Sequence, residues 1–452
     1  MSKQNNTDQQ SMEYKELLKK KLMNKDAAVG VIGLGYVGLP LAVEKAKVGF
    51  QVIGFDRNVS RVAQVNHGEN YIKDVKNDEL KELVAKKKII ATADFSKIAE
   101  VDVIVICVPT PLTITRDPDI SYIVNVTKEI AKYIKPGKLV TLESTTYPGT
   151  TSEVILPKLE ATGLKVGQDF FLAFSPERVD PGNLRYTTKN TSKVVGGITP
   201  ACLSIAQNFY EQTILNIVPV SSTAVAEMTK VFENTYRAVN IALVNEMMLL
   251  CDRMGIDIWE VVDAAGTKPF GIQTFYPGPG VGGHCIPIDP FYLTWKAREY
   301  DFHTRFIELA GEVNIQASYH VIHKVNRVLS SHKKSFSGAN ILVLGVAYKN
   351  DIDDCRESPA LKIIDLMLKE NAQVTYHDAF VPEIKSHAPY TYNMKSIDLT
   401  DEAIANADCI VITTKHSEID YEHIVEHAQA VVDTRNACKN INAQLKYKIT
   451  KI

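Results

Sequence analysis

The chain has 452 residues, of which 45% are hydrophobic and 23% are charged, and its formal net charge is −2 at pH 7. This length exceeds what one hydrophobic core supports, so we expect two or three domains of an ordinary globular protein. The near-neutral charge excludes the strong positive field needed to bind nucleic acid or an anionic membrane, and no apolar run reaches membrane-spanning length.

Seven cysteines are spread along the chain without the paired spacing of a zinc site or a disulfide framework. We therefore expect no metal and a reducing, cytoplasmic environment. The polar N-terminal segment lacks the apolar stretch of a signal peptide. Residues 1–27 are expected to form a solvated extension, in which residues 11–23 can form a short basic helix on the outside.

The first organised segment is an apolar strand that runs into Gly33, Gly35 and Gly38, spaced as Gly-x-Gly-x-x-Gly, followed by a helix. Such glycines allow a tight turn, close approach of a pyrophosphate to the backbone, and close packing of the helix. A second strand ends in Asp56, 21 residues after Gly35. A carboxylate there accepts hydrogen bonds from ribose hydroxyls and repels a 2′-phosphate, which predicts NAD, although the adjacent Arg57 is compatible with NADP.

Further apolar runs are typical of strands buried on both faces of a parallel sheet. These runs are 101–108, 139–145 and 170–177. Their carboxyl ends should meet at the edge where doubly wound sheets bind ligands. The residues delivered to that edge are Pro109, Thr110, Thr145 and Glu177. For Thr145, simple capping of a helix is the alternative.

No Gly or Pro interrupts the segment from Ser222 to Arg253, and its apolar residues recur at helical spacing. We expect one helix of roughly 45 Å at 1.5 Å per residue. Lys230, Asn234 and Arg237 form a polar stripe along it. A solvated stripe is one explanation, but the helix is apolar on most other sides, which favours burial between domains, a functional Lys230, and a dimer interface.

The segment from Gly278 to Asp289 reads Gly-Pro-Gly-Val-Gly-Gly-His-Cys-Ile-Pro-Ile-Asp. It places Cys285 among glycines and prolines, where the backbone rather than packed neighbours holds the thiol. Cys285 is therefore a candidate nucleophile with Asp289 as its acid–base partner. A structural cysteine in a flexible loop is the alternative.

A second strand–helix array follows further helices at about 290–331. Its first turn has only Gly345, so a second dinucleotide is not expected. Lys349 and Arg435 instead lie at strand ends and supply cations for a phosphorylated ligand. The fold class is α/β, with two Rossmann-like doubly wound domains joined by a long central helix. The expected divisions are an extension, an NAD-binding domain, a central helical domain with the cysteine loop, and a substrate domain, at 1–27, 28–220, 221–331 and 332–452.

Six motifs in this order resemble the UDP-glucose/GDP-mannose dehydrogenase family from Ala28 to about Arg435. They are Gly33-x-Gly35-x-x-Gly38, Glu143-Ser-Thr145, Ser175-Pro-Glu177, the helix with Lys230 and Asn234, Gly282-Gly-His-Cys285, and Ala347-Tyr-Lys349 followed by Asp354-Cys-Arg356-Glu-Ser. The sequences around Glu177 and Cys285 resemble those of the UDP-N-acetylhexosamine 6-dehydrogenase branch, and especially those of the UDP-N-acetylglucosamine enzymes. The UDP-glucose branch carries a Lys at the position of Ile288 and an acid at that of Pro181, beside Asp180.

The resemblance implies oxidation of the sugar C6 alcohol to a carboxylate with two NAD molecules, through a thiohemiacetal and a thioester on Cys285. Lys230 and Asn234 would steady the oxyanion, with Lys230 also a candidate acid–base group, Asp289 and Thr145 would position water, and Glu177 would act in hydrolysis. The residues expected to contact the cofactor are Gly33, Gly35, Tyr36, Val37, Gly38, Asp56, Arg57, Pro109, Thr110 and Thr145. The expected substrate contacts are Glu177, Arg178, Lys230, Asn234, Arg237, Gly282, Lys349 and Arg435.

Three other functions stay open. Two are oxidation of UDP-N-acetylmannosamine and of UDP-glucose by the same chemistry. The third is a non-catalytic NAD-binding sensor or scaffold, against which the intact set of Cys285, Lys230, Asn234 and Asp289 argues. The expected partners are a UDP-sugar and further copies of the chain in a homodimer or larger oligomer.

Overall fold

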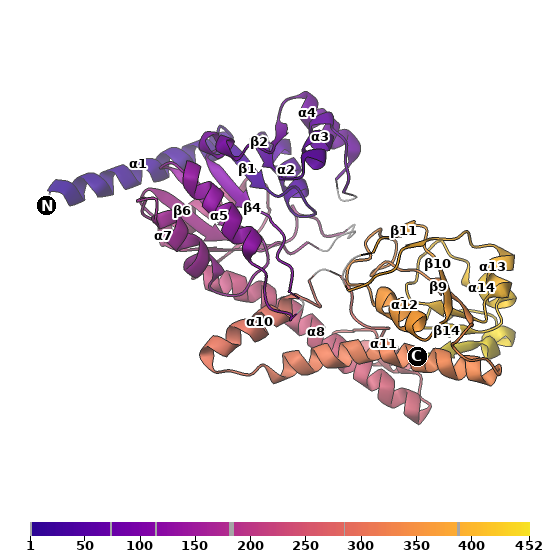
Figure 1. The fold of residues 1–452 in the computed structure, drawn as a ribbon. Coiled ribbons are helices and arrows are strands. Elements are labelled where there is room, and N and C mark those ends of the chain that lie inside the picture. The colour runs from indigo at the N-terminus through magenta and orange to yellow at the C-terminus, as the bar shows by residue number, and fades with distance from the viewer. Residues whose placement is uncertain (1, 73–74, 114, 180–184, 284, 387–388) are drawn as a thin grey trace. The chain divides into compact units, whose positions relative to one another are not determined.

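The computed structural model describes residues 2–72, 75–113, 115–179, 185–283, 285–386 and 389–452, with side chains from residue 12 onward (Figure 1). The chain divides into two compact units. Unit 1 comprises Met1–Glu233 and Trp295–Asp301, and unit 2 comprises Asn234–Thr294 and Phe302–Ile452.

Unit 1 contains an eight-stranded sheet in the order β3-β2-β1-β4-β5-β6-β7-β8. Its strands are β1 Ala28–Ile32, β2 Gln51–Phe55, β3 Ile89–Thr92, β4 Val103–Ile106, β5 Lys138–Leu142, β6 Phe170–Phe174, β7 Lys193–Gly197 and β8 Ile217–Val220. The first six in this order are parallel, β7 pairs antiparallel with β6, and β8 is parallel to β7. The order reverses between β1 and β4, so the glycine turn after β1 lies where such sheets bind dinucleotides.

The sheet of unit 1 is covered on both faces, because its strands are apolar at successive positions. Val103 and Val105 point into the core that α2 and α7 cover, and Ile104 and Ile106 into the core beneath α5 and α6. The helical segments are α1 Ser2–Asn24, α2 Gly38–Lys47, α3 Val59–His67, α4 Asn77–Ala85, η1 Phe95–Glu100, α5 Ser121–Tyr133, η2 Thr150–Ile155, α6 Leu156–Glu160, α7 Pro200–Glu211 and η3 Arg298–Tyr300.

The N-terminal segment differs from the expected solvated extension. Helix α1 is longer than residues 11–23, and its Leu18 and Leu22 are buried in the core of unit 1. Lys21 also forms an ion pair with Asp102 at 2.7 Å. The expectation of a purely solvated segment is therefore wrong for the last turns of α1, because two leucines one turn apart suffice to dock a polar helix.

Unit 2 contains a five-stranded parallel sheet in the order β10-β9-β13-β14-β15 and a two-stranded β11–β12 ribbon. The strands are β9 Asn340–Leu344, β10 Gln373–His377, β11 Glu383–Ile384, β12 Met394–Lys395, β13 Cys409–Ile412, β14 Val431–Asp433 and β15 Ile449–Lys451. Helices α11 and α12 pack on one face, and α13 and α14 on the other. The helical segments are α9 Ile258–Gly266, α11 Arg305–Ser331, α12 Pro359–Lys369, α13 Asp401–Asn406, α14 Tyr421–His427 and η4 Ala443–Lys448.

The long helix predicted from the uninterrupted segment is α8, Thr223–Met254, of 32 residues. The chain of α8 continues from unit 1 into unit 2, and α10, Asp289–Ala297, returns to unit 1. Lys230 is buried as expected, but Phe232 and Leu243 are 63% and 55% exposed, so the helix is not covered on every apolar side. No helix among the described residues is both long and apolar enough to cross a bilayer. The predicted fold class, two α/β domains with a long central helix, is confirmed.

Candidate active site

The glycine turn of unit 1 is fixed by packing at two of its three glycines. Gly33 has φ of 93°, and a Cβ there would lie 2.4 Å from the carbonyl oxygen of Cys107. A Cβ on Gly38 would lie 1.8 Å from the oxygen of Gly33, so only glycine lets α2 start this close to β1. A Cβ on Gly35 would meet no described atom within 4 Å. The backbone at Gly35 therefore offers the open face that a pyrophosphate needs.

Asp56 closes this turn from the end of β2. One carboxylate oxygen accepts a hydrogen bond from the Leu34 N–H at 3.0 Å, and the other accepts one from the Asn58 N–H at 2.8 Å. Asp56 is 9% exposed, whereas Arg57 and Tyr36 are exposed beside it and Val37 is half-buried. The turn, the open backbone at Gly35 and this carboxylate together fit NAD.

The ends of β4 and β5 meet as predicted. The Thr110 hydroxyl donates to the Thr145 carbonyl oxygen at 2.7 Å, and the Ser144 hydroxyl donates to the Val108 carbonyl oxygen at 2.7 Å. Pro109 is exposed between them. Thr145 does not cap a helix, because the residue that caps the following segment η2 is Gly149. Thr145 thus stays a candidate for contact with cofactor or water.

A buried charge cluster lies beneath these strand ends. The Lys193 ammonium, at the start of β7, is 2.9 Å from a Glu143 carboxylate oxygen and 3.4 Å from one of Glu177. The Tyr210 hydroxyl donates to the other Glu143 oxygen at 2.8 Å. Burial acts against the charge on Lys193, but the two carboxylates outweigh it and raise its pKa. Lys193 is therefore a permanent cation between two acids.

Glu177 is held as a carboxylate by its neighbours. Burial alone would raise its pKa, but Lys193, the backbone N–H groups of Val179 and Arg178, and Lys230 act together to lower it. Lys230 itself is 9% exposed. The Arg178 side chain is engaged elsewhere, with its Nη2 2.5 Å from a Glu233 oxygen and its Nη1 donating to the Ser192 carbonyl oxygen at 2.6 Å. Glu177 can accept a proton at neutral pH.

A further buried acid, Glu227 on α8, anchors the loop that follows Thr145. Its oxygens accept hydrogen bonds from the Gly149 N–H at 2.6 Å and from the Thr151 N–H at 2.8 Å. Burial raises the pKa of Glu227 to about 7, although these donors act in the opposite direction. The acid connects α8 to the segment that carries the threonines.

In unit 2 the cysteine loop is held by its backbone. The Cys285 carbonyl oxygen accepts the Asp289 N–H at 2.8 Å, so the half-buried Cys285 lies one turn before α10. The Gly283 N–H donates to the Arg356 carbonyl oxygen at 3.3 Å, and Gly283 has φ of 92°. A Cβ on Gly282 would lie 2.8 Å from Tyr348 Cβ. Gly282 and Gly283 are therefore required by close packing and backbone conformation, and Cys285 precedes the N-terminus of α10.

Asn234 and Asp289 are brought together within unit 2. The Asn234 amide donates to an Asp289 carboxylate oxygen at 2.5 Å, and these residues are 4% and 3% exposed. Lys230 lies one turn before Asn234 on α8, whereas Arg237, the third residue of the predicted stripe, is exposed. The amide fixes the orientation of a buried acid four residues after the cysteine.

The two cations predicted to hold phosphate, Lys349 and Arg435, lie in unit 2. The Arg435 side chain donates to the Thr413 carbonyl oxygen at 2.9 Å, and a Cβ on Gly278 would lie 2.6 Å from its guanidinium. Burial lowers the pKa of Arg435 to about 10, against the effect of Asp433, and leaves it cationic at neutral pH. Lys349 is half-buried after β9. Arg435 therefore lies between the glycine loop and the carboxyl end of β13 in the second sheet.

Lys193, Tyr210 and Glu227 were not predicted from the sequence. A lone Lys before the otherwise apolar strand Val194–Gly197 is the signal that could have marked Lys193, because an unpaired buried ammonium is costly. His284 of the Gly282–Cys285 motif, and Asp180 and Pro181 after Glu177, lie outside the described residues.

Comparison with known proteins places this geometry in a family. Residues 27–214 match the NAD-binding domain of the UDP-glucose/GDP-mannose dehydrogenase family, residues 224–316 its central domain, and residues 342–440 its UDP-binding domain. The UDP-N-acetyl-D-glucosamine 6-dehydrogenase of Pseudomonas aeruginosa is 36% identical over 397 residues, covering 87% of this chain and 92% of that protein. The UDP-N-acetyl-D-mannosamine dehydrogenase of Pyrococcus horikoshii is 34% identical, covering 91% and 96%.

A solved structure of the UDP-N-acetyl-D-mannosamine dehydrogenase from Pyrococcus horikoshii has a TM-score of 0.84 at 32% identity, with 94% of this chain and 99% of that chain covered. The match therefore extends over both units rather than one shared domain. The chain belongs to the UDP-glucose/GDP-mannose dehydrogenase family and is an NAD-dependent nucleotide-sugar dehydrogenase.

Proposed function

We propose that the chain oxidises the C6 hydroxyl of a UDP-N-acetylhexosamine to a carboxylate, with UDP-N-acetylglucosamine as the preferred substrate. The observation that carries the proposal is the cysteine loop, in which Cys285 precedes α10 and the buried Asp289 is fixed by Asn234. The N-acetylglucosamine relative from Pseudomonas aeruginosa supports the gluco epimer. The relatives from Pyrococcus horikoshii favour the manno epimer as the second candidate.

NAD, when bound at the glycine turn, accepts a hydride in each of the two oxidations. Loss of the first hydride and a proton converts the C6 alcohol to an aldehyde. An aldehyde has no hydride to give until a nucleophile makes its carbon tetrahedral, so the Cys285 thiolate adds to it and forms a thiohemiacetal. The second oxidation leaves a thioester, and water then releases the carboxylate and restores the thiol.

The chain's own groups have distinct roles in this scheme. Cys285 supplies the thiolate, and Lys230 and Asn234 stabilise the negative oxygen of the tetrahedral species. Asp289, held by Asn234, orients the water that attacks the thioester, with Thr145 as a further contact. Glu177, whose lowered pKa keeps it a carboxylate at neutral pH, accepts a proton from that water.

We assign binding of the UDP group to two cations of unit 2. Lys349 and Arg435 neutralise the pyrophosphate of UDP, because a partly buried guanidinium and ammonium bind phosphate more strongly than exposed ones. Gly282 gives the sugar close access to the loop backbone. Arg178 and Arg237 are assigned secondary contacts with the sugar or diphosphate.

The test is NADH formation by the purified, tag-free chain with UDP-N-acetylglucosamine, UDP-N-acetylmannosamine and UDP-glucose in parallel. We expect two NADH per sugar and the highest kcat/KM with the first. A preference for one of the other two sugars would correct the substrate, and one NADH per sugar would contradict the covalent route. Cofactor binding without turnover of any UDP-sugar would indicate a sensor.

Cys285→Ser should stop release of the uronate while NAD still binds, because a serine alkoxide is far less accessible at neutral pH than a thiolate. Cys251→Ser is the matched control, since Cys251 is also partly exposed but lies on α8 away from the loop sequence. Full activity of the Cys285 variant would refute its role as nucleophile.

We also propose a homodimer formed along α8. Its exposed apolar side chains follow one another at intervals of three, four or seven residues, which places them on neighbouring positions of the helix surface. They are Val225, Met228, Phe232, Tyr236, Leu243 and Leu250. Contiguous exposed apolar surface of this kind favours self-association. Light scattering should give twice the chain mass, and Phe232→Glu should lower it toward one chain; a wild-type monomer would contradict the dimer.

A further inference from the structure

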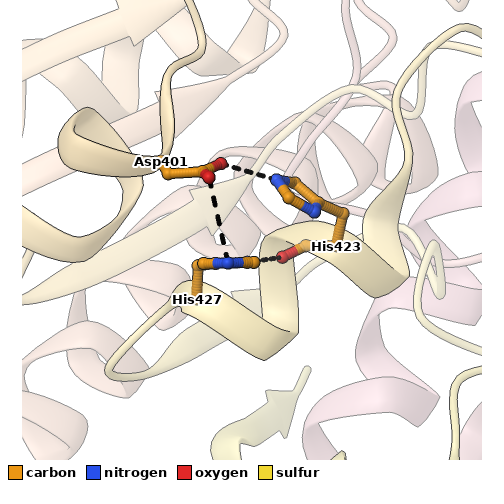
Figure 2. Close-up of side chains that lie close together, drawn as sticks. All are labelled: Asp401, His423 and His427. Atoms are coloured by element: carbon orange, nitrogen blue, oxygen red, sulfur yellow. Dashed lines mark hydrogen bonds and ion pairs between the residues drawn. The ribbon is translucent and has the colours of Figure 1, made fainter.

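Two histidines of α14 and an aspartate of α13 lie close together, on helices that carry none of the proposed catalytic, cofactor-binding or substrate-binding residues. His423 and His427 lie four residues apart and therefore share one face of α14, and Asp401 is the first residue of α13 (Figure 2). All three are partly or largely exposed, with side-chain exposures of 44%, 38% and 66% for His423, His427 and Asp401. Neither imidazole is needed to fill the core of unit 2.

The three side chains present donor atoms to one point. His423 Nε2 is 2.7 Å from one Asp401 oxygen, and His427 Nε2 is 4.0 Å from the other. One donor atom from each residue lies within 4.8 Å of the other two. Donors on a tetrahedral zinc ion lie about 3.3 Å apart, given metal–ligand bonds of about 2.0 Å. Small rotations of exposed side chains therefore bring all three to bonding distance.

The second nitrogen of His427 is already engaged. His427 Nδ1 is 2.9 Å from the carbonyl oxygen of His423, to which it can donate a hydrogen bond. That bond selects the tautomer with the lone pair on Nε2, the nitrogen that faces Asp401. Figure 2 draws the two contacts of this ring as separate dashed lines, one to Asp401 and one to the His423 carbonyl oxygen. A metal-binding histidine is commonly oriented in this way by its other ring nitrogen.

We propose that Asp401, His423 and His427 bind one divalent transition-metal ion, Zn²⁺ or a metal of similar preference, with water completing its coordination. Imidazole nitrogens favour Zn²⁺, Ni²⁺, Co²⁺ and Cu²⁺, whereas Mg²⁺ and Ca²⁺ require a set of oxygens that three such residues do not provide. His423 also lines a hollow of about 360 Å³, which gives solvent access to this ring. The ion would join the start of α13 to the end of α14.

The test is equilibrium dialysis of the tag-free full chain against Ni²⁺, with the bound metal quantified. We expect about one ion per chain, at least tenfold weaker binding in His423→Gln and in His427→Gln, and weaker binding in Asp401→Asn. His303→Gln is the matched control, because His303 is also exposed and lies 3.1 Å from a single carboxylate, that of Glu308. Its affinity should equal that of the wild type, and excess Mg²⁺ should not displace the Ni²⁺.

The cysteines give the alternative that the experiment must separate. Co²⁺ bound by imidazole and carboxylate lacks the near-ultraviolet charge-transfer band that a thiolate ligand produces. Such a band, binding unchanged by His427→Gln, or no bound ion at all would each overturn the proposal. NADH formation without added metal should be the same in the wild type and His427→Gln, so this result is independent of the proposed catalytic mechanism.

Discussion

Lys193→Met removes the cation from the buried charge cluster of unit 1. The side chain of Lys193 is 4% exposed and that of Glu143 is fully buried, and their charged atoms are 2.9 Å apart. Methionine has a similar length and no charge, so the substitution keeps most of the packing. It leaves Glu143 as a buried carboxylate whose remaining described partner is the Tyr210 hydroxyl.

The expected loss is about 3–5 kcal/mol of the free energy of unfolding of unit 1, because removing one partner of a buried ion pair leaves an uncompensated charge. Glu143→Gln in the same chain removes that charge and can still accept the Tyr210 hydrogen bond. The double variant should therefore recover at least half of the loss. A positive coupling of this size exceeds what independent substitutions give.

Urea unfolding followed by tryptophan fluorescence measures this loss for unit 1 alone. The chain has two tryptophans: Trp259 belongs to unit 2, and Trp295 belongs to unit 1 with its ring 4.9 Å from that of Tyr147. In a Trp259→Phe background the signal comes from Trp295. A loss below about 1 kcal/mol for Lys193→Met, or a double variant no more stable than the single one, would refute the reasoning.

The same substitution should also change the pH dependence of activity. Lys193 helps to lower the pKa of Glu177, so its removal raises that pKa. If Glu177 acts as a carboxylate, the acidic limb of the rate of uronate release moves to higher pH. An unchanged acidic limb would show that Glu177 does not act as the base in the hydrolytic step.

Four other substitutions test the cofactor site and α8. Gly35→Ala should fold normally but lose NAD binding, because its Cβ meets no described protein atom within 4 Å. Gly38→Ala should destabilise unit 1, because its Cβ would lie 1.8 Å from the Gly33 carbonyl oxygen. Calorimetry measures the unfolding temperature and the NAD affinity of both variants. Asp56→Ser should lower the NAD/NADP ratio of kcat/KM by about 10- to 100-fold, through loss of charge-assisted hydrogen bonds and of repulsion; an unchanged ratio would refute its role. The pKa of Glu227 is about 7 in the folded chain against 4.5 for a free glutamate, so its protonated form stabilises unit 1 fully below pH 4.5. This contribution, at most about 3 kcal/mol, is lost as pH rises through 7. Glu227→Gln should flatten the pH dependence of the free energy of unfolding measured in urea.

The elements that could be predicted from the sequence are those with local causes. The glycine turn before α2 follows from backbone geometry within six residues, and Asp56 follows from the length of one strand–helix–strand unit. The length of α8 follows from the absence of Gly and Pro over some thirty residues. The residues at the ends of β4 and β5 were placed correctly, because carboxyl ends of parallel strands share one edge.

The pairs that hold the site together could not be predicted in this way. Lys193 lies 50 residues from Glu143, and Asn234 lies 55 residues from Asp289. The four-residue spacing of His423 and His427 is readable on a helix, but Asp401 lies 22 residues before His423. Hydrophobic spacing fixes which face of an element is buried and leaves open which element covers it.

The sequence by itself determined the fold class, the cofactor turn and the cysteine loop, since each depends on the conformational freedom or periodicity of neighbouring residues. The tertiary structure decided which charges meet, including the pairing of Lys193 with two acids after β7 joins the sheet in the antiparallel sense. The docking of Leu18 and Leu22 was likewise decided by the core that receives them. Such contacts depend on the packing of distant segments, whose energies no local pattern encodes.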